Sequence, residues 1–533
     1  MKNSVSYKKE KIKGYFQTYT NFNQRKGTEI AFLAKNKCRT AKAMQYFSTR
    51  NKSITKKPSE AILRGIAEDG GLYIPAHFER FPLETLTEMT PKTISETVLT
   101  LLFGNDDMFR TDGSLAAAVA RAYDGKFDGE DYAPLAKVGD TFVMELYHGP
   151  TAAFKDVALR LLPQLLGEAR RAQEIDGEIV ILTATSGDTG SAALHGFSDV
   201  PGTRIIVFYP KDGTSAVQER QMVSCKGKNT CVCAVKGNFD DAQSGVKEIF
   251  KEASLPENVR LSSANSINIG RLAPQVAYYF KAYRDLLLSG EITMGGQVNF
   301  VVPTGNFGDI LAGYFAMRMG LPVGRLICAS NQNNVLSDFF ASGIYDRNRD
   351  FHITRSPSMD ILISSNLERL IAMICGTEAC AEYMRALAET GRYQIAADEL
   401  AKIKEVFGAG FADDAATYKT IRAVYEKEGY LMDTHTAVAW NVYEQCKNEL
   451  EGKTVILSTA SAYKFSSSVL DALGVSYENE FDAIEKLKAK TGVAVPGGLA
   501  DILEKEIVHK NVIEKGDMLA FVENIIKGGV ENE

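Results

Sequence analysis

The chain has 533 residues, of which 45% are hydrophobic and 24% charged, and its formal net charge at pH 7 is −6. This composition is typical of a globular protein of about two to four domains, and the charge does not favour binding to nucleic acid. No apolar run of roughly 18 residues predicts a membrane span. The eight cysteines are scattered, which favours reduced thiols and a cytoplasmic protein, and no histidine near Cys231 and Cys233 completes a metal site.

Residues 1–43 differ from the rest of the chain. They are rich in lysine, contain only Glu10 and Glu29 as acidic residues, and have no apolar stretch of the kind found in a secretory signal. A second methionine, Met44, opens the segment that follows. We interpret residues 1–43 as an extraneous or leader extension, with a functional extension as the alternative.

From Met44 the patterns predict a small N-terminal domain and then a larger α/β region. Residues 44–140 are loop-rich, with a turn and short strand over 70–75 and helical periodicity over 94–103. Beyond them, apolar strands alternate with helices, which predicts parallel sheets flanked by helices over 141–533, in two lobes with a helical insertion at about 338–429. The expected strands are 178–183, 204–209, 297–302 and 454–458, and the expected helices include 156–172, 275–288 and 310–319.

Lys155 is the first candidate for chemistry. It lies between small residues and Phe154 on one side and an amphipathic helix on the other. A lysine held at a helix start can be desolvated, and a desolvated amine loses proton affinity and becomes a nucleophile. The reaction that such a lysine most often serves is Schiff-base formation, above all with pyridoxal 5'-phosphate.

Two loops that follow predicted strands have the composition of anion sites. The first contains Ser186, Gly187, Asp188 and Thr189 at a helix start, where free backbone amides favour an anion. A plain turn with Asp188 as the N-cap explains the same residues. The second loop contains Gly305, Asn306, Phe307, Gly308 and Asp309, and it matches neither a Walker motif nor a dinucleotide fingerprint.

Other polar residues near predicted strand ends and helix starts extend this set. Thr459 follows the strand 454–458, where its hydroxyl could face a heteroaromatic nitrogen or cap a helix. Arginine is well shaped to bind phosphate, and Arg271 ends a polar segment that includes Asn265, Ser266 and Asn268. His148 and His435 are possible acids or bases, although packing or capping explains each of them.

Together these segments resemble the threonine synthase family. The motifs are H-G-P-T-x-A-F-K-D, A-T-S-G-D-T-G-S-A, S-x-N-S-I-N-x-x-R, P-T-G-N-F-G-D, D-x-H-T-A and S-T-A-S-A-x-K-F, and they occur in the family's order from Met44 nearly to the C-terminus. The resemblance implies the tryptophan-synthase-β-like fold of pyridoxal-phosphate enzymes, known as fold type II. The form of the G-N-F-G-D loop is similar to the long bacterial and fungal branch.

The resemblance also implies a role for each motif. Lys155 would carry the cofactor as a Schiff base, residues 305–309 would hold its phosphate, and Thr459 would face its pyridine nitrogen. Residues 186–189 would receive the substrate carboxylate. Asn265, Ser266, Asn268 and Arg271 would lie near the substrate phosphate, with Lys464 as a possible second cation.

The implied reaction is β,γ-replacement on O-phospho-L-homoserine, which yields L-threonine and phosphate, in a monomer or homodimer. A serine/threonine dehydratase or an amino-acid phospholyase of the same fold is the main alternative. A dehydratase substrate carries no phosphate, so the arginine-bearing segment argues against it. A ligand-binding protein without catalysis and a nucleic-acid binder that uses the basic residues of 1–43 are further alternatives.

Overall fold

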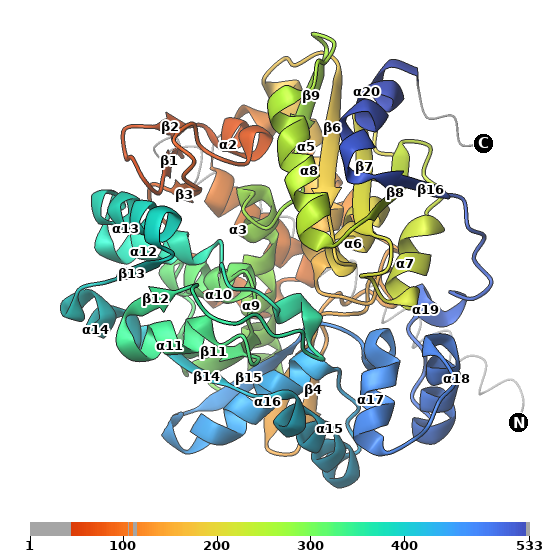
Figure 1. The fold of residues 1–533 in the computed structure, drawn as a ribbon. Coiled ribbons are helices and arrows are strands. Elements are labelled where there is room, and N and C mark those ends of the chain that lie inside the picture. The colour runs from red at the N-terminus through yellow and green to blue at the C-terminus, as the bar shows by residue number, and fades with distance from the viewer. Residues whose placement is uncertain (1–43, 105, 110–113, 529–533) are drawn as a thin grey trace, which may run out of the picture.

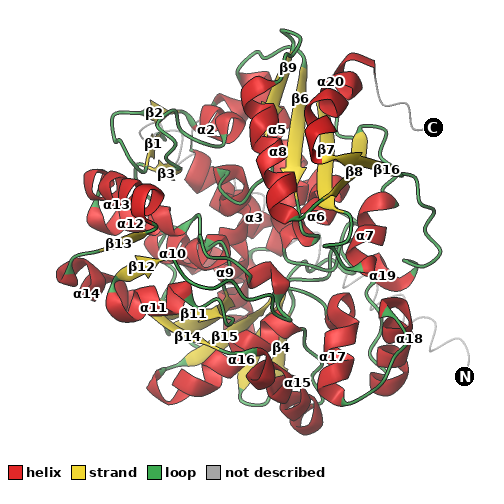
Figure 2. Cartoon of the chain, in the orientation of Figure 1, coloured by secondary structure: helices red, strands yellow, loops and turns green. Residues whose placement is uncertain are grey.

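We describe residues 44–104, 106–109 and 114–528 from a computed structural model of the chain (Figure 1). The expected extension, residues 1–43, lies outside these described residues. These described residues form four sheets, with helices around the two largest of them (Figure 2). No helix within the described ranges is long and apolar enough to cross a membrane.

The first described segment folds into a small antiparallel sheet and a group of helices. The predicted short strand is confirmed as β3, and the predicted helix is confirmed as α3, which begins earlier than expected because Thr90 caps it and Pro91 takes its first position. The elements are β1 (Tyr46–Ser48), β2 (Thr55–Lys56), α2 (Pro58–Arg64), β3 (Tyr73–Pro75), η1 (Leu83–Glu88), α3 (Pro91–Phe103), η2 (Asp107–Phe109) and α4 (Ser114–Tyr123).

A five-stranded parallel sheet forms one lobe, in the order β16-β8-β7-β6-β9. Alternate residues of its strands enter different cores: Val180 and Leu182 pack with α8 and α20, and Ile179 and Ile181 pack in the core that contains α5 and α6. Both faces are therefore covered. The elements are α5 (Lys155–Ala172), β6 (Glu178–Ala184), α6 (Asp188–Phe197), β7 (Thr203–Pro210), α7 (Ala216–Val223), β8 (Thr230–Lys236), α8 (Phe239–Glu252), β9 (Val259–Ser262), β16 (Asn511–Glu514), η6 (Lys515–Asp517) and α20 (Met518–Gly528).

A six-stranded sheet forms the second lobe, in the order β14-β11-β10-β15-β5-β4, and all its pairs are parallel except β4 with β5. Phe300 of β10 packs in the core with α9 and α10, whereas its neighbour Val301 packs in the core with α16. The elements are β4 (Leu135–Val138), β5 (Thr141–Glu145), α9 (Ile269–Leu288), β10 (Val298–Pro303), α10 (Gly308–Arg318), β11 (Val323–Ser330), α16 (Thr434–Cys446), η4 (Lys447–Glu449), β15 (Lys453–Ser458), η5 (Ala462–Phe465), α17 (Ser466–Leu473), α18 (Glu480–Thr491) and α19 (Gly497–Ala500).

The expected helical insertion contains more than helices. Its last strand, β14, pairs in parallel with β11 and becomes an edge of the six-stranded sheet. The insertion is therefore built into the second lobe. Its elements are α11 (Val335–Ser342), β12 (Ile344–Asp346), η3 (Pro357–Met359), α12 (Leu367–Cys375), α13 (Thr377–Thr390), β13 (Arg392–Gln394), α14 (Ala397–Val406), β14 (Phe407–Phe411) and α15 (Asp414–Glu428).

Helices α5 and α6 approach each other closely at one glycine. A Cβ on Gly196 would lie 2.1 Å from the carbonyl oxygen of Leu159, so the two helices would have to separate to accept it. We expect Gly196→Ala to lower the free energy of unfolding by about 1–3 kcal/mol, as overpacking does. Denaturant unfolding followed by circular dichroism measures the loss.

The matched control is Gly167→Ala, at a position on α5. A Cβ at Gly167 meets no atom within 4 Å, so the substitution is expected to leave stability unchanged or to raise it by up to about 1 kcal/mol. Equal destabilisation by the two changes would contradict the importance of the close approach at Gly196.

Candidate active site

Lys155 is the first residue of α5, and the turn before it is held on two sides. The buried carboxylate of Asp156 accepts hydrogen bonds from the amide and the hydroxyl of Thr151, each at 2.8 Å. The Phe154 amide donates to the Thr459 carbonyl oxygen at 2.8 Å. These contacts hold Lys155 beside the end of β15.

The amine of Lys155 is largely removed from water. Its side chain is 12% exposed, and Nζ lies 3.2 Å from Oδ2 of Asp188. Burial lowers the pKa of Lys155, the charge of Asp188 opposes that shift, and the charges of Lys464 and Arg271 add to it. A lowered pKa leaves more free amine at neutral pH, which a Schiff-base nucleophile and a general base both need.

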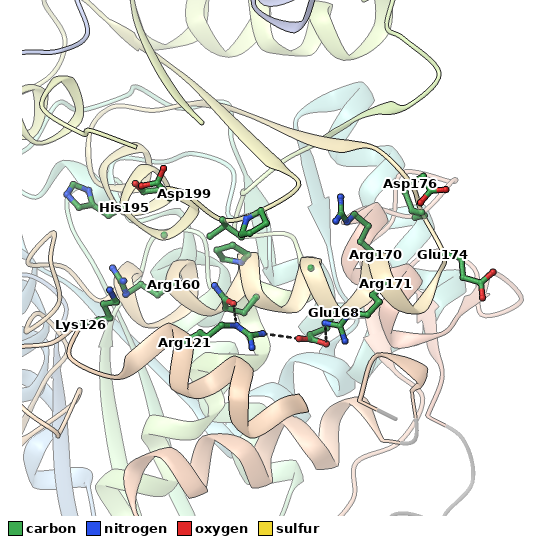
Figure 3. A pocket seen from close by; sticks show the side chains of 18 residues that line it. Arg121, Lys126, Arg160, Glu168, Arg170, Arg171, Glu174, Asp176, His195 and Asp199 are labelled. Atoms are coloured by element: carbon green, nitrogen blue, oxygen red, sulfur yellow. Dashed lines mark hydrogen bonds and ion pairs between the residues drawn. The ribbon is translucent and has the colours of Figure 1, made fainter. Parts of the chain in front are cut away.

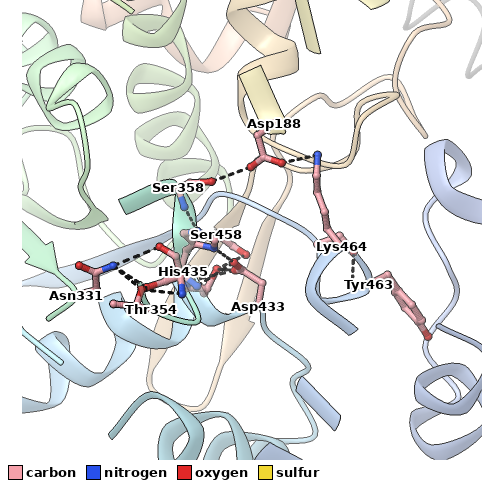
Figure 4. Close-up of polar contacts among 12 residues, drawn as sticks. Asp188, Asn331, Thr354, Ser358, Asp433, His435, Ser458, Tyr463 and Lys464 are labelled. Carbon is pink, nitrogen blue, oxygen red and sulfur yellow. Dashed lines mark hydrogen bonds and ion pairs between the residues drawn. The ribbon is translucent and has the colours of Figure 1, made fainter. Parts of the chain in front are cut away.

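Asp188 lies at the centre of a cluster of four donors. Its Oδ2 accepts from Lys155 and, at 2.9 Å, from the Ser358 hydroxyl. Its Oδ1 accepts from Gln218 Nε2 at 2.7 Å and from Lys464 Nζ at 2.8 Å. Figure 4 shows Ser358 and Lys464 on either side of this carboxylate. Sequence patterns point to neither Ser358 nor Gln218.

The alternative in which Asp188 caps α6 is wrong. The N-cap is Gly187, and it is Thr185 Oγ1 that accepts from the amides of Gly187 and Gly190, each at 3.0 Å. Burial alone would raise the pKa of the Asp188 carboxyl, but Lys155 and Lys464 hold it well below its ordinary value. Two buried ammonium groups are stronger partners for this carboxylate than the helix start is.

An ionised Asp188 side chain would repel a substrate carboxylate, so any contact with one at this position has to come from the backbone amide. Ser186 is exposed and Thr189 half-buried, so both hydroxyls are accessible. The expected role of residues 186–189 stays a prediction.

The loop 305–309 lies between β10 and α10. Phe307 adopts a left-handed conformation, with φ of 62°, and its ring packs against Phe340 and Phe407. The carboxyl of Asp309 accepts from the hydroxyls of Tyr278 and Tyr279. Burial raises the pKa of Asp309 to about 7 although both hydrogen bonds oppose it. Since these side chains point into the protein, the loop offers an anion its backbone amides at the start of α10.

Thr459 directly follows β15, and its carbonyl oxygen is bonded to Phe154. Thr459 is a buried residue whose hydroxyl forms no hydrogen bond within the described part of the chain, whereas the neighbouring Ser461 caps η5. The contact of the Thr459 hydroxyl with a ring nitrogen stays a prediction. Helix capping was the alternative role for Thr459, and Ser461 fills that role instead.

In the polar segment before α9, some side chains form hydrogen bonds within the protein and others are accessible to a ligand. Asn268 caps α9 through Oδ1 and donates from Nδ2 to the Ile62 carbonyl oxygen, so its side chain is engaged at both ends. Asn265 is exposed and Ser266 half-buried. Arg271 is 3% exposed and donates to the Ala264 carbonyl oxygen, and no carboxylate pairs with it among the described residues.

Over the ranges that the structure describes, Arg271 is therefore a buried cation without a counter-charge. Its Nε has no hydrogen-bond partner in the described structure, and burial lowers its pKa to about 10, which still leaves it charged at neutral pH. Such a group favours an anionic ligand. Lys464 is different, because its buried amine already contacts Asp188 and the Thr151 carbonyl oxygen.

Both candidate histidines contact carboxylates. His148 Nε2 lies 2.9 Å from Glu145; burial lowers the pKa of His148, but Glu145 and Asp128 raise it more. His435 is buried, with Nδ1 2.6 Å from Asp433 and Nε2 accepting from the Ser358 amide at 3.1 Å. Neither is recorded in contact with Lys155.

A cavity of about 960 Å³ lies elsewhere, along α5 and the end of α6, and Lys155 does not line it (Figure 3). Several of the arginine side chains that line it are already paired with other groups of the protein. Arg121 and Arg171 both pair with Glu168, and Arg170 donates to the Gly177 carbonyl oxygen. This cavity is separate from the cluster around Lys155.

Comparison with known proteins bears on the cluster around Lys155. A family model described as a pyridoxal-phosphate dependent enzyme matches residues 133–461, and models of the threonine synthase N terminus and C-terminal part match residues 45–123 and 436–520. Threonine synthase from Pseudomonas aeruginosa is 36% identical over 468 residues, which cover 87% of this chain and 94% of the relative. The chain belongs to the threonine synthase family.

Two further relatives extend this result. The pyridoxal-phosphate-bound threonine synthase from Brucella melitensis has a TM-score of 0.81 at 36% identity, covering 91% of this chain and 99% of its own. Human threonine synthase-like 1 is 36% identical over 492 residues, and the match covers 89% of this chain but 65% of that longer protein. The expected fold type, the expected cofactor and membership of a lyase family are confirmed.

The residues present fit pyridoxal phosphate. Lys155 supplies a buried amine with a lowered pKa, and the loop 305–309 turns its bulky and acidic side chains away from the start of α10. Asp309, with its raised pKa, also carries less charge to repel a phosphate. Lys155 would hold the ring of pyridoxal phosphate, and the backbone amides of residues 305–309 would hold its phosphate group.

Proposed function

We propose that the protein converts O-phospho-L-homoserine and water to L-threonine and phosphate, the last step of threonine biosynthesis. The observation that carries the proposal is Arg271, a buried guanidinium that pairs with no carboxylate in the described part of the chain and whose charge acts on Lys155. A substrate that bears its own phosphate would supply the missing negative charge. Family membership supports the same reaction.

Different residues of the site carry out different steps of the β,γ-replacement. Lys155 would hold pyridoxal phosphate, which would supply an electron sink for the charge that develops on the substrate. The Lys155 amine removes one proton from Cα and one from Cβ, which its lowered pKa favours, and protons are later returned to Cα and Cγ. Arg271 binds the phosphate group and stabilises its departure from Cγ. The amides and hydroxyls of residues 186–189 receive the substrate carboxylate. Water adds at Cβ, which takes its hydroxyl, and the remaining proton of the water passes to the released phosphate.

The alternative is another lyase of this fold, a serine/threonine dehydratase or an amino-acid phospholyase. The two outcomes differ in their products. Incubation with O-phosphohomoserine should release phosphate and threonine, whereas a dehydratase would convert threonine to 2-oxobutyrate. Production of 2-oxobutyrate without phosphate release would overturn the proposal.

We expect Arg271→Lys to lower kcat/KM for O-phosphohomoserine by about 10- to 100-fold, mainly through KM. Lysine keeps the charge but loses the planar fork that binds phosphate oxygens in pairs. Competition by inorganic phosphate should weaken to a similar degree, and the absorbance of bound pyridoxal phosphate should not change.

The matched control is Arg260→Lys, at an exposed position of β9, which should leave both constants unchanged. Unaltered phosphate competition in Arg271→Lys would place the phosphate-binding group elsewhere.

We further infer a cytoplasmic enzyme that acts on a small amino acid as a monomer or homodimer, and that needs neither nucleic acid nor a membrane. The described cysteines support a reducing compartment, because all of them are free and most are buried. Residues 1–43 are proposed to be dispensable, and their deletion should leave activity unchanged.

A further inference from the structure

A segment of the insertion crosses the candidate site, and we call residues 352–366 the strap. Asn331 Nδ2 donates to Thr354 Oγ1 near the start of the strap at 2.9 Å, and to Asp360 Oδ1 in its middle at 2.7 Å. Near its end, the Ser364 hydroxyl donates to the Gly305 carbonyl oxygen at 2.7 Å. The strap is therefore tied at both ends to loops of the six-stranded lobe.

The middle of the strap is held by a buried histidine. The Ser358 amide donates to Nε2 of His435 at 3.1 Å, and since an amide can only donate, Nε2 must carry the lone pair. The proton then lies on Nδ1, which donates to Asp433 Oδ2 at 2.6 Å. Asp433 is fully buried and also accepts from the amides of His435 and Thr436 at the start of α16, so it fixes the ring.

The side chain of Ser358 leaves the strap toward the other lobe. Its hydroxyl donates to Oδ2 of Asp188 at 2.9 Å, the same oxygen that lies 3.2 Å from Lys155 Nζ. Figure 4 follows the path from Asp433 through His435 and Ser358 to Asp188. The orientation of the Asp188 carboxylate is thereby linked to a histidine on α16 of the six-stranded lobe.

We propose that Ser358 is a positioning residue for the Asp188–Lys155 pair, and that His435 and Asp433 hold it in place. The proposal rests on the proposed role of Lys155. By donating to Oδ2 of Asp188, the Ser358 hydroxyl neutralises part of the negative charge on that oxygen. Without the hydroxyl, Lys155 would be the one donor of the two that remains at Oδ2. Loss of the hydroxyl leaves that charge to the ammonium group and favours its protonated form.

The groups that face Lys155 come from several elements. Asp188 on α6 favours its protonated form, whereas Lys464 on η5 and Arg271 on α9 oppose it. The Ser358→Ala change alters none of these charges and keeps the backbone amide that His435 binds. It therefore isolates the effect of the hydroxyl.

The test uses the full chain freed of cofactor. Pyridoxal phosphate is added over a range of pH, and the rate of Schiff-base formation is followed by absorbance, because only the free amine reacts. In Ser358→Ala the midpoint of this rate profile should move up by about half a pH unit to one unit. Ser358→Thr, which keeps a hydroxyl, should restore it, and Ser342→Ala, on the exposed end of α11, should match the unmodified protein.

A second variant separates positioning from general structural support. His435→Ala should also move the midpoint up, and it should speed hydrogen exchange in peptides of the strap, whereas Ser358→Ala should leave that exchange unchanged. An unmoved midpoint in Ser358→Ala would overturn the proposal. The measurement needs no amino-acid substrate, so a protein that shows the shift without releasing phosphate would contradict the proposed function alone.

Discussion

Lys155→Ala is expected to reduce turnover by about four orders of magnitude and to abolish the absorbance of the bound Schiff base. The change removes both the attachment point and the base, and each contributes a large factor to catalysis. Kinetics with O-phosphohomoserine and the absorbance spectrum of the purified variant measure the two losses.

The control for Lys155→Ala is Lys226→Ala, because Lys226 lies on the surface and pairs with Glu506. It should keep full activity and the full chromophore. Lys464 is the amine best placed to compete, since it contacts the same carboxylate. Borohydride reduction and peptide mass spectrometry locate the attachment point, and a pyridoxyl group on another lysine of the unmodified protein would refute the assignment of Lys155.

Asp188→Asn is expected to lower the free energy of unfolding by about 3–5 kcal/mol, as removal of one partner from a buried ion pair does. The amide nearly preserves the shape of the side chain but leaves Lys464, whose side chain is fully buried, without a counter-charge. Denaturant unfolding at pH 7 measures the loss. Asp398→Asn breaks an exposed pair with Lys402 on α14 and should cost less than about 1 kcal/mol.

The contribution of Asp188 should depend on pH in a defined direction. Because folding lowers the pKa of its carboxyl, the stabilisation is complete above the unfolded pKa of about 4 and is lost as the pH falls through the folded value. The difference in stability between the unmodified protein and Asp188→Asn should therefore be constant near neutrality and shrink in acid. A difference that grows in acid would contradict the ion-pair account.

Several elements of the fold were predictable because their physical cause is local. The strands β6, β7, β10 and β15 are continuous apolar runs, and their predicted bounds differ from the observed ones by at most one residue at either end. Helix α9 begins at Ile269, well before the predicted residue 275, because Asn268 caps it and Pro274 is accepted inside its early turns.

Strand β14 shows why local patterns fail elsewhere. Its sequence, Phe407 to Phe411, contains two glycines and carries no strand signal. Its place in the sheet requires them, since a Cβ on Gly408 would lie 2.7 Å from Ile327 and one on Gly410 would lie 2.9 Å from Val442. Only the neighbouring segments reveal the reason for these glycines.

The candidate site divides in the same way. Lys155 and the two loops were predictable from short motifs, whereas Ser358 lies in a segment without a recognisable pattern. The engagement of Asn268 with Ile62 and of Lys464 with Asp188 depends on residues far away in the chain. Motifs therefore identify candidate residues, and tertiary contacts determine which side chains remain available to a ligand.

The four donors around Asp188 also have a consequence for how the protein folds. They come from residues 155, 218, 358 and 464, so the cluster joins segments from most of the chain. Contacts between segments so distant in sequence form late, after the intervening chain has been ordered. During refolding, a reactive amine at Lys155 is therefore expected only after both lobes have folded and assembled. Neither lobe by itself contains all the residues that surround this amine.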